Sequence, residues 1–159
     1  MIRDIVQNGN TALRSKAESL SIEEIRSSEI QTLISDMHET LAAEESGVAL
    51  AAPQVGVSKQ IFVVHPKVFE EGVERNLVFI NPKIVKHSRG FADRDEGCLS
   101  IRKKYGIVPR HEKVVVRALD ENGVEFTRGA SELLAHLVQH EIDHLNGVLF
   151  IDKATEMIA

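Results

Sequence analysis

Apolar residues recur at helical spacing in the first third of the chain. Five of them follow Ser28 and fall on one face of a helix: Ile30, Leu33, Ile34, Met37 and Leu41. This stripe predicts an amphipathic helix from Ser28 to about Glu44, with its apolar face in the core. A shorter helix is expected at TALRSKAESL, residues 11–20.

The middle of the chain has the pattern of β-strands. Apolar runs occur in QIFVVHP (60–66) and NLVFINPKIV (76–85), and KVVVRALDENGVEF (113–126) alternates on both sides of an Asn-Gly turn, which predicts a hairpin. GVALAAPQVG (47–56) is rich in small residues. It is expected to be a strand or loop whose backbone another chain can approach closely.

A final helix is predicted at ELLAHLVQHEIDHL, residues 132–145, with Ser131 as its cap and Asn146-Gly147 as its end. Helices therefore stand at the ends of the chain and strands in the middle, without regular alternation. This order favours an α+β fold, with antiparallel strands packed around a C-terminal helix. At 159 residues, the chain is expected to form a single domain over residues 1–159.

The composition of the chain mainly excludes classes of binding partner. A hydrophobic content of 43% with 27% charged residues is typical of a globular protein. The net charge of -5 predicts neither sequence-specific nucleic-acid binding nor binding to an anionic membrane. A local basic run, Arg102-Lys103-Lys104 followed by Arg110 and Lys113, is expected to be a solvated loop.

Targeting signals are also absent from the pattern. MIRDIVQNGN lacks the charged and apolar regions of a secretory signal, and no apolar run is long enough to span a membrane. The single cysteine, Cys98, cannot form an internal disulfide. These features together predict a cytoplasmic protein.

QHEIDHL, residues 139–145, contains the pattern His-Glu-x-x-His on the last predicted helix. His140 and His144 are four residues apart, about 40° around the helix axis and about 6 Å along it, so both imidazoles can converge on one metal ion. Glu141 lies beside such an ion, where it can take a proton from bound water. The pattern therefore predicts a catalytic metal site.

A catalytic site of this kind usually has a third protein ligand. The metzincin pattern would place a histidine where Phe150 stands, and the thermolysin-like arrangement needs a glutamate from a later helix, for which only a short segment follows. Upstream, Cys98 would complete a Cys-His-His site with one open position. The other candidates are histidines, which are more often surface or core residues: His38, His65, His87, His111 and His136.

Three segments carry a resemblance to a known family. GVALAAPQ (47–54), EGCLS (96–100) and QHEIDHLNG (139–147) resemble, in order and spacing, the three motifs of peptide deformylase. The similarity runs from the MIRDIV opening to the terminal FIDKA. Family members remove the formyl group from the N-formylmethionine of nascent chains in bacteria and organelles, and release formate.

The resemblance implies a role for each matched residue. Cys98, His140 and His144 would be the metal ligands, and Glu141 the proton carrier. The Gln54 side chain and the backbone N–H of Leu99 would stabilise the transition state. The metal would be iron(II) natively, with zinc, nickel or cobalt accepted.

Substrate contacts are implied in the same way. Gly47, Val48 and Ala49 would bind the nascent formyl-Met polypeptide as an added strand. Its methionine side chain would enter an apolar pocket lined by Val48, Leu99 and Leu137. Acting on nascent chains implies a transient ribosome contact and a cytoplasmic, bacterial-type location.

The chain departs from the family pattern at two positions. Ala49 stands where the family usually has glycine, and Arg102 stands where a proline is common. We expect Ala49 to alter KM modestly. For His136, one turn before His140, we expect a solvated histidine in preference to the alternative, a place at the pocket rim. Two alternative functions are a related metalloamidase or peptidase acting on another acyl group, and a metal-binding protein without catalysis.

Overall fold

Two antiparallel sheets and a central helix make up the structure. The computed structural model of the chain describes residues 1–69 and 76–158. The larger sheet has the strand order β1-β2-β3-β6-β7, with β1 at Ala49–Ala51, β2 at Ile61–Val64, β3 at Val78–His87, β6 at Lys113–Leu119 and β7 at Glu125–Ser131. The smaller sheet has the order β4-β5-β8, with β4 at Phe91–Cys98, β5 at Ile101–His111 and β8 at Glu156–Met157. The predicted α+β fold with antiparallel strands is confirmed.

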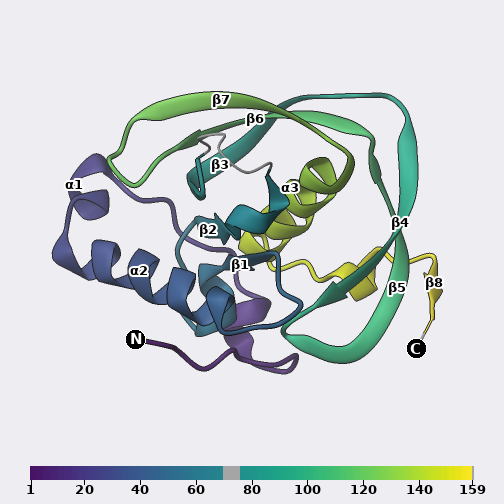
Figure 1. Ribbon diagram of the computed structural model, residues 1–159, viewed down its shortest axis with the longest axis horizontal. Helices are drawn as coiled ribbons and strands as arrows, with labels where there is room; N and C mark the ends of the chain where they lie inside the picture. The colour runs from purple at the N-terminus through teal and green to yellow at the C-terminus, as the bar shows by residue number, and fades with distance from the viewer. Residues whose placement is uncertain (70–75, 159) are drawn as a thin grey trace.

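The helical elements of these ranges are α1 (Ile22–Ile25), α2 (Ser28–Ala42), α3 (Glu132–Leu145) and the short 3-10 turns η1 (Thr11–Leu13), η2 (Ala52–Val55), η3 (Pro66–Val68) and η4 (Phe150–Asp152). Figure 1 shows α3 near the centre of the molecule, with β6 and β7 arching over it and α2 on the outside. α3 contacts β1, β5, β6 and β7, so both sheets meet around it. None of the described helices is long and apolar enough to cross a bilayer.

Strand β2 divides the core between two helices. Its four residues are all buried. Phe62 and Val64 belong to the apolar cluster that surrounds α3, whereas Ile61 and Val63 belong to the cluster that includes α2. Because successive side chains of a strand point to opposite faces, a strand covered on both faces is apolar throughout. This explains the unbroken run of apolar residues in the sequence.

Most of the predicted elements are present. The amphipathic helix is α2, and its stripe is buried as expected. The predicted hairpin is formed by β6 and β7, and its turn is closed by the N–H of Gly123, which donates to the carbonyl of Asp120. The last helix also forms over its predicted residues, but the Ser131 side chain makes no capping hydrogen bond.

The short helix predicted at TALRSKAESL is wrong. Only η1 forms there, because the backbone after it pairs with other parts of the chain. The N–H of Ala17 donates to the carbonyl of Leu145, and the N–H of Glu18 donates to the carbonyl of Ser58. These tertiary hydrogen bonds replace the ones that a helix would make within itself.

The loop predicted for the basic run is also wrong, although Arg102, Lys103 and Lys104 are solvent-exposed as expected. Arg102, Lys103 and Lys104 lie in β5, and Arg110, further along the same strand, is buried. The β4–β5 hairpin was not expected from the sequence, since β4 is largely polar and its apolar residues do not alternate. Lys103 has a positive φ of 62°, which marks an irregular point in β5.

The end of α3 packs tightly against η1. Gly147 follows the helix with a φ of 74°. A Cβ added there would lie 2.5 Å from the carbonyl oxygen of Arg14. The glycine therefore allows both the left-handed turn and the close approach of the two segments.

Candidate metal centre

His140 and His144 lie one helical turn apart on α3, and their rings meet edge to face with centroids 4.9 Å apart. Cys98 is at the end of β4, and its Sγ is 3.3 Å from Nε2 of His144. The ligand atoms of the three residues all lie within 4.8 Å of one another. The structure thus brings together the three side chains that the sequence proposed as a ligand set.

This donor set fits a tetrahedral metal ion. For metal–sulfur and metal–nitrogen bonds of ordinary length, the sulfur and nitrogen atoms of such a site lie about 3.6 Å apart. Burial lowers the pKa of His144 well below its usual value, which favours the neutral imidazole that a metal ion needs. In the described ranges, no other group of three such side chains converges in this way.

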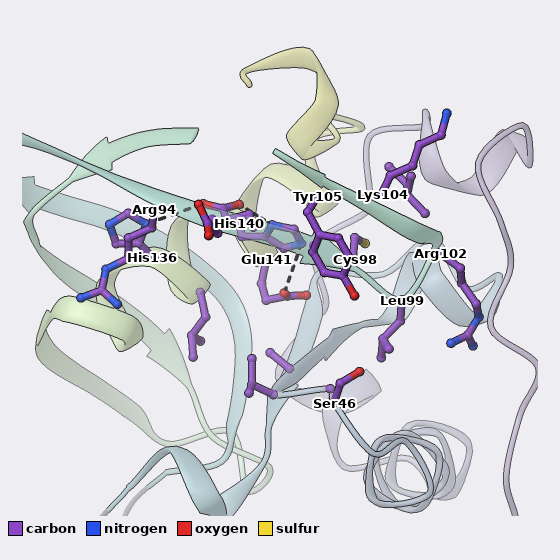
Figure 2. A pocket seen from close by; sticks show the side chains of 18 of the residues that line it. Ser46, Arg94, Cys98, Leu99, Arg102, Lys104, Tyr105, His136, His140 and Glu141 are labelled. Atoms are coloured by element: carbon purple, nitrogen blue, oxygen red, sulfur yellow. Dashed lines mark hydrogen bonds and ion pairs between the residues drawn. The ribbon is translucent and has the colours of Figure 1, made fainter. Parts of the chain in front are cut away.

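Glu141 lies beside the three ligand residues but does not complete their set. Its carboxylate is buried, and its Oε2 is 3.8 Å from Nε2 of His140, as the dashed line in Figure 2 marks. Oε1 has no hydrogen-bond partner among the described residues. Burial raises the pKa of Glu141 to about 7.

A chain of charged groups orients His140. Its Nδ1 is 2.8 Å from Oε1 of Glu96. Arg110 donates two hydrogen bonds to Glu96, at 2.8 and 2.9 Å, and a third to Asp143 at 2.6 Å. Burial alone would raise the pKa of Glu96, but Arg110 and His140 outweigh it and lower that pKa to about 2. Glu96 is therefore a carboxylate that fixes the ring of His140 from behind.

Gln54 points its amide into the same site. The N–H of Ala51 donates to Oε1 of Gln54 at 2.9 Å, which fixes the orientation of the side chain. Its Nε2 then donates to Oγ of Ser100 at 3.2 Å and lies 3.5 Å from Sγ of Cys98. The amide N–H groups therefore face the candidate metal centre.

Gln54, Glu96, Cys98, His140 and Glu141 line one pocket with a volume of about 640 Å³. The pocket contains all the site residues that the sequence proposed except His144, which is buried behind them: Gly47, Val48, Ala49, Gln54, Cys98, Leu99, Leu137, His140 and Glu141. Gly47 lies under the loop after Cys98, where an added Cβ would be 2.9 Å from Cδ1 of Leu99. The catalytic and binding roles of these residues stay predictions.

Two expectations about polar residues near the site are wrong. His136 is only 3% exposed and lines the pocket instead of being solvated. Arg110 is 2% exposed and holds Glu96 instead of facing water. Glu96 could have been found from sequence, since it stands two residues before Cys98, and on a strand this places both side chains on one face.

A buried carboxylate beside three converging ligands, in a pocket next to an edge strand, is typical of a metal-dependent hydrolase. Comparison with known proteins shows which family of this class the chain matches. Residues 2–158 match the family model described as polypeptide deformylase. A peptide deformylase of Symbiobacterium thermophilum is 46% identical over 156 residues, which cover 98% of this chain and 68% of the relative.

Solved structures agree. A class I type b peptide deformylase from Acinetobacter baumannii has a TM-score of 0.87 and 34% identity, covering 96% of this chain and 99% of its own. A peptide deformylase from Legionella pneumophila has a TM-score of 0.86 and 40% identity, covering 98% of this chain and 87% of its own. The chain belongs to the polypeptide deformylase family. It is a metal-dependent hydrolase that removes the formyl group from N-formylmethionine at the start of nascent polypeptides.

Proposed function

We propose that the enzyme performs this reaction with one divalent metal ion held by Cys98, His140 and His144, and with Glu141 as the group that moves protons. The observation that carries the proposal is the convergence of three ligand atoms within 4.8 Å beside a buried carboxylate. Three protein ligands leave one position open, whereas a purely structural metal site is normally closed by four.

Hydrolysis of a formamide needs an activated water, a polarised carbonyl and a proton for the departing nitrogen. A divalent ion bound here supplies the first two, because it lowers the pKa of water and polarises the carbonyl oxygen. Glu141 takes the proton of the attacking water and later gives it to the leaving nitrogen. Its unpartnered Oε1 is available for that proton.

Negative charge that develops on the formyl oxygen needs hydrogen-bond donors in place beforehand. We assign this role to Nε2 of Gln54 and to the backbone N–H of Leu99. The hydrogen bond from Ala51 to Oε1 supports the assignment, because it keeps the donor end of Gln54 turned towards the site. Losing one such donor typically lowers turnover by roughly 10²–10³.

The substrate backbone is proposed to pair with the edge of β1. That strand is at the end of the larger sheet, and its first residue, Ala49, lines the pocket together with the preceding Gly47 and Val48. The methionine side chain would lie among Val48, Leu99 and Leu137. One structure of the Acinetobacter baumannii enzyme has Met-Ala-Ser bound, which supports a peptide that begins with methionine as the ligand.

The native ion is proposed to be iron(II), with zinc, nickel or cobalt as possible substitutes. One thiolate and two imidazoles suit several of these metals, so the donor set is compatible with each. We further propose that residues 1–159 form one catalytic domain that works in the cytoplasm. Because its substrate is a nascent chain, the enzyme would contact the ribosome transiently.

The test compares formyl-Met-Ala-Ser with acetyl-Met-Ala-Ser, using protein loaded anaerobically with iron(II) or nickel(II). We expect formate release from the first peptide only. Cleavage of both peptides at similar rates would instead favour a general metalloamidase.

The variant Glu141→Ala tests whether Glu141 moves the protons. It is expected to bind one equivalent of metal and to lose at least about 10³ in turnover. A variant that binds metal and keeps its activity would remove Glu141 from the mechanism.

A further inference from the structure

Four basic side chains line the pocket at its mouth. Arg94 is on β4, and Arg102, Lys103 and Lys104 are on β5. In Figure 2, Arg102 and Lys104 lie on one side of Cys98, and Arg94 lies on the other side, next to His136. Positive charge therefore flanks the candidate metal centre from two directions. We call these four residues the basic rim.

The backbone of β5 gathers three of these residues on one side. In a regular strand, neighbouring side chains point to opposite faces. Here Arg102, Lys103 and Lys104 are consecutive, yet all three line the pocket. Lys103 has the positive φ of 62° that breaks the alternation. A lysine is rarely found in that conformation, and such strained residues cluster at functional sites.

The charge of the rim is only partly balanced. Arg102 makes an ion pair with Glu44 at 3.1 Å, but the side chain of Arg102 stays 49% exposed. Of the nearby carboxylates, the buried Glu96 is bound by Arg110, and Asp95, which also lines the pocket, offsets one of the positive charges. Within residues 1–69 and 76–158, no ion pair joins a carboxylate to Lys103 or Lys104. This local excess of positive charge contrasts with the net charge of -5 for the whole chain.

The part of the substrate that all nascent chains share cannot use this charge. Formyl-methionine has an apolar side chain, and the formyl group removes the charge of its amine. The reacting end would lie at Cys98, His140 and Glu141, and the basic rim lines the same pocket, so the residues after the methionine would pass close to the rim. We infer that the basic rim selects formyl-Met peptides with acidic residues directly after the methionine.

This inference rests on the proposed function. RNA is a less suitable partner, because the four side chains line a pocket together with Gly97, Leu99 and Tyr105, whereas RNA binding calls for a basic stripe along an outer face. An acidic side chain of a flexible peptide substrate can instead enter the mouth of the pocket with the rest of the peptide.

The first experiment uses two peptides of nearly equal shape, formyl-Met-Asp-Ala-Ala and formyl-Met-Asn-Ala-Ala, with metal-loaded protein. We expect kcat/KM to be about threefold to tenfold higher for the Asp peptide at low salt. The difference should lie in KM, since the charge contributes equally to binding of the ground state and the transition state. At about 0.5 M salt the ratio should fall towards one.

The second experiment changes the rim. The double variant Lys103→Asn, Lys104→Gln removes two charges, and asparagine tolerates a positive φ. The Asp/Asn ratio of kcat/KM is expected to fall at least about threefold. The control is Lys86→Gln, an exposed lysine on β3 outside the pocket, which should leave the ratio as it is.

Equal kcat/KM for the two peptides in the unmodified protein would overturn the inference, while hydrolysis of both would leave the proposed function standing. An unchanged ratio in the double variant would also overturn it. If that variant sediments less with ribosomes while its ratio is unchanged, the rim binds RNA. Hydrolysis of neither peptide would count against the proposed function itself.

Discussion

The ring of His140 is fixed by Glu96, a residue that does not belong to the proposed ligand set. Nδ1 of His140 lies 2.8 Å from the Glu96 carboxylate, so Nε2 is left for a metal ion. Arg110 in turn prevents Glu96 from turning away, because it donates to both of its oxygens. Part of the metal affinity is therefore expected to depend on Glu96 and Arg110, which are outside the proposed ligand set.

Glu96→Gln is expected to lower metal affinity by about 10–100-fold, because an amide orients the imidazole less well and does not raise its basicity. The measurement is competition for zinc or nickel against a chromophoric chelator. Asp93→Asn is the matched control, since this carboxylate is exposed on the same strand and should not change the affinity. Equal affinities for Glu96→Gln and the unmodified protein would contradict the role given to Glu96.

At the scale of single residues, the candidate reactive residues could be predicted from the sequence better than the residues that hold them in place. Cys98, His140 and Glu141 could be proposed because few residue types perform their chemistry. Arg110 was misplaced, because a charged residue in a basic run is usually solvated and only the folded chain brings it to Glu96 and Asp143. His136 was misplaced for the same reason, since a helix period alone does not show which polar residue faces a pocket.

At the scale of elements, α3 ends where the chain returns close to η1. Gly147→Ala should lower the free energy of unfolding by about 2–3 kcal/mol, because it combines a positive φ with a Cβ placed 2.5 Å from a carbonyl oxygen. For a protein of this size, that corresponds to a melting temperature lower by roughly 4–10 °C.

Gly129→Ala provides the comparison for this change. Gly129 is exposed in β7, and a Cβ added there would meet no heavy atom within 4 Å. We expect its melting temperature to stay within about 2 °C of the unmodified protein. Similar losses for both variants, measured by calorimetry, would show that close packing at Gly147 is not the cause.

Helices and strands with a regular hydrophobic periodicity were predicted well, whereas the largely polar strand β4 was not. α2, α3 and the β6–β7 hairpin each bury one regular face, so their pattern is visible in the sequence. β4 has few buried residues, and its pairing with β5 depends on backbone hydrogen bonds that any sequence can make. The missed hairpin is also the element that carries Cys98.

At the scale of the whole molecule, the buried Glu96–Arg110 pair links stability to pH. The pKa of Glu96 is lowered from 4.5 to about 2, since Arg110 and His140 outweigh the effect of burial. The stabilisation is therefore fully present above about pH 4.5 and is lost as the pH falls through 2. The corresponding free energy is roughly 3 kcal/mol.

We expect metal-free protein to become less stable towards urea as the pH falls from about 5 to about 2.5. Glu96→Gln should be less stable at pH 7, because Arg110 loses one of its two carboxylate partners and keeps only Asp143, but its stability should depend less on pH in this range. Parallel stability curves for the two proteins would mean that other carboxylates determine the acid transition.

The position of Cys98 has a mechanical consequence. Cys98 belongs to the smaller sheet and His144 to α3, which contacts both sheets, and the two residues are 46 positions apart along the chain. An ion held by both would be a reversible cross-link between two packing units, comparable to a disulfide that a chelator can open. Glu96–His140 and Arg110–Asp143 already join the β4–β5 hairpin to α3. Loading the centre would add a further attachment, and would hold this wall of the substrate pocket more firmly against the helix.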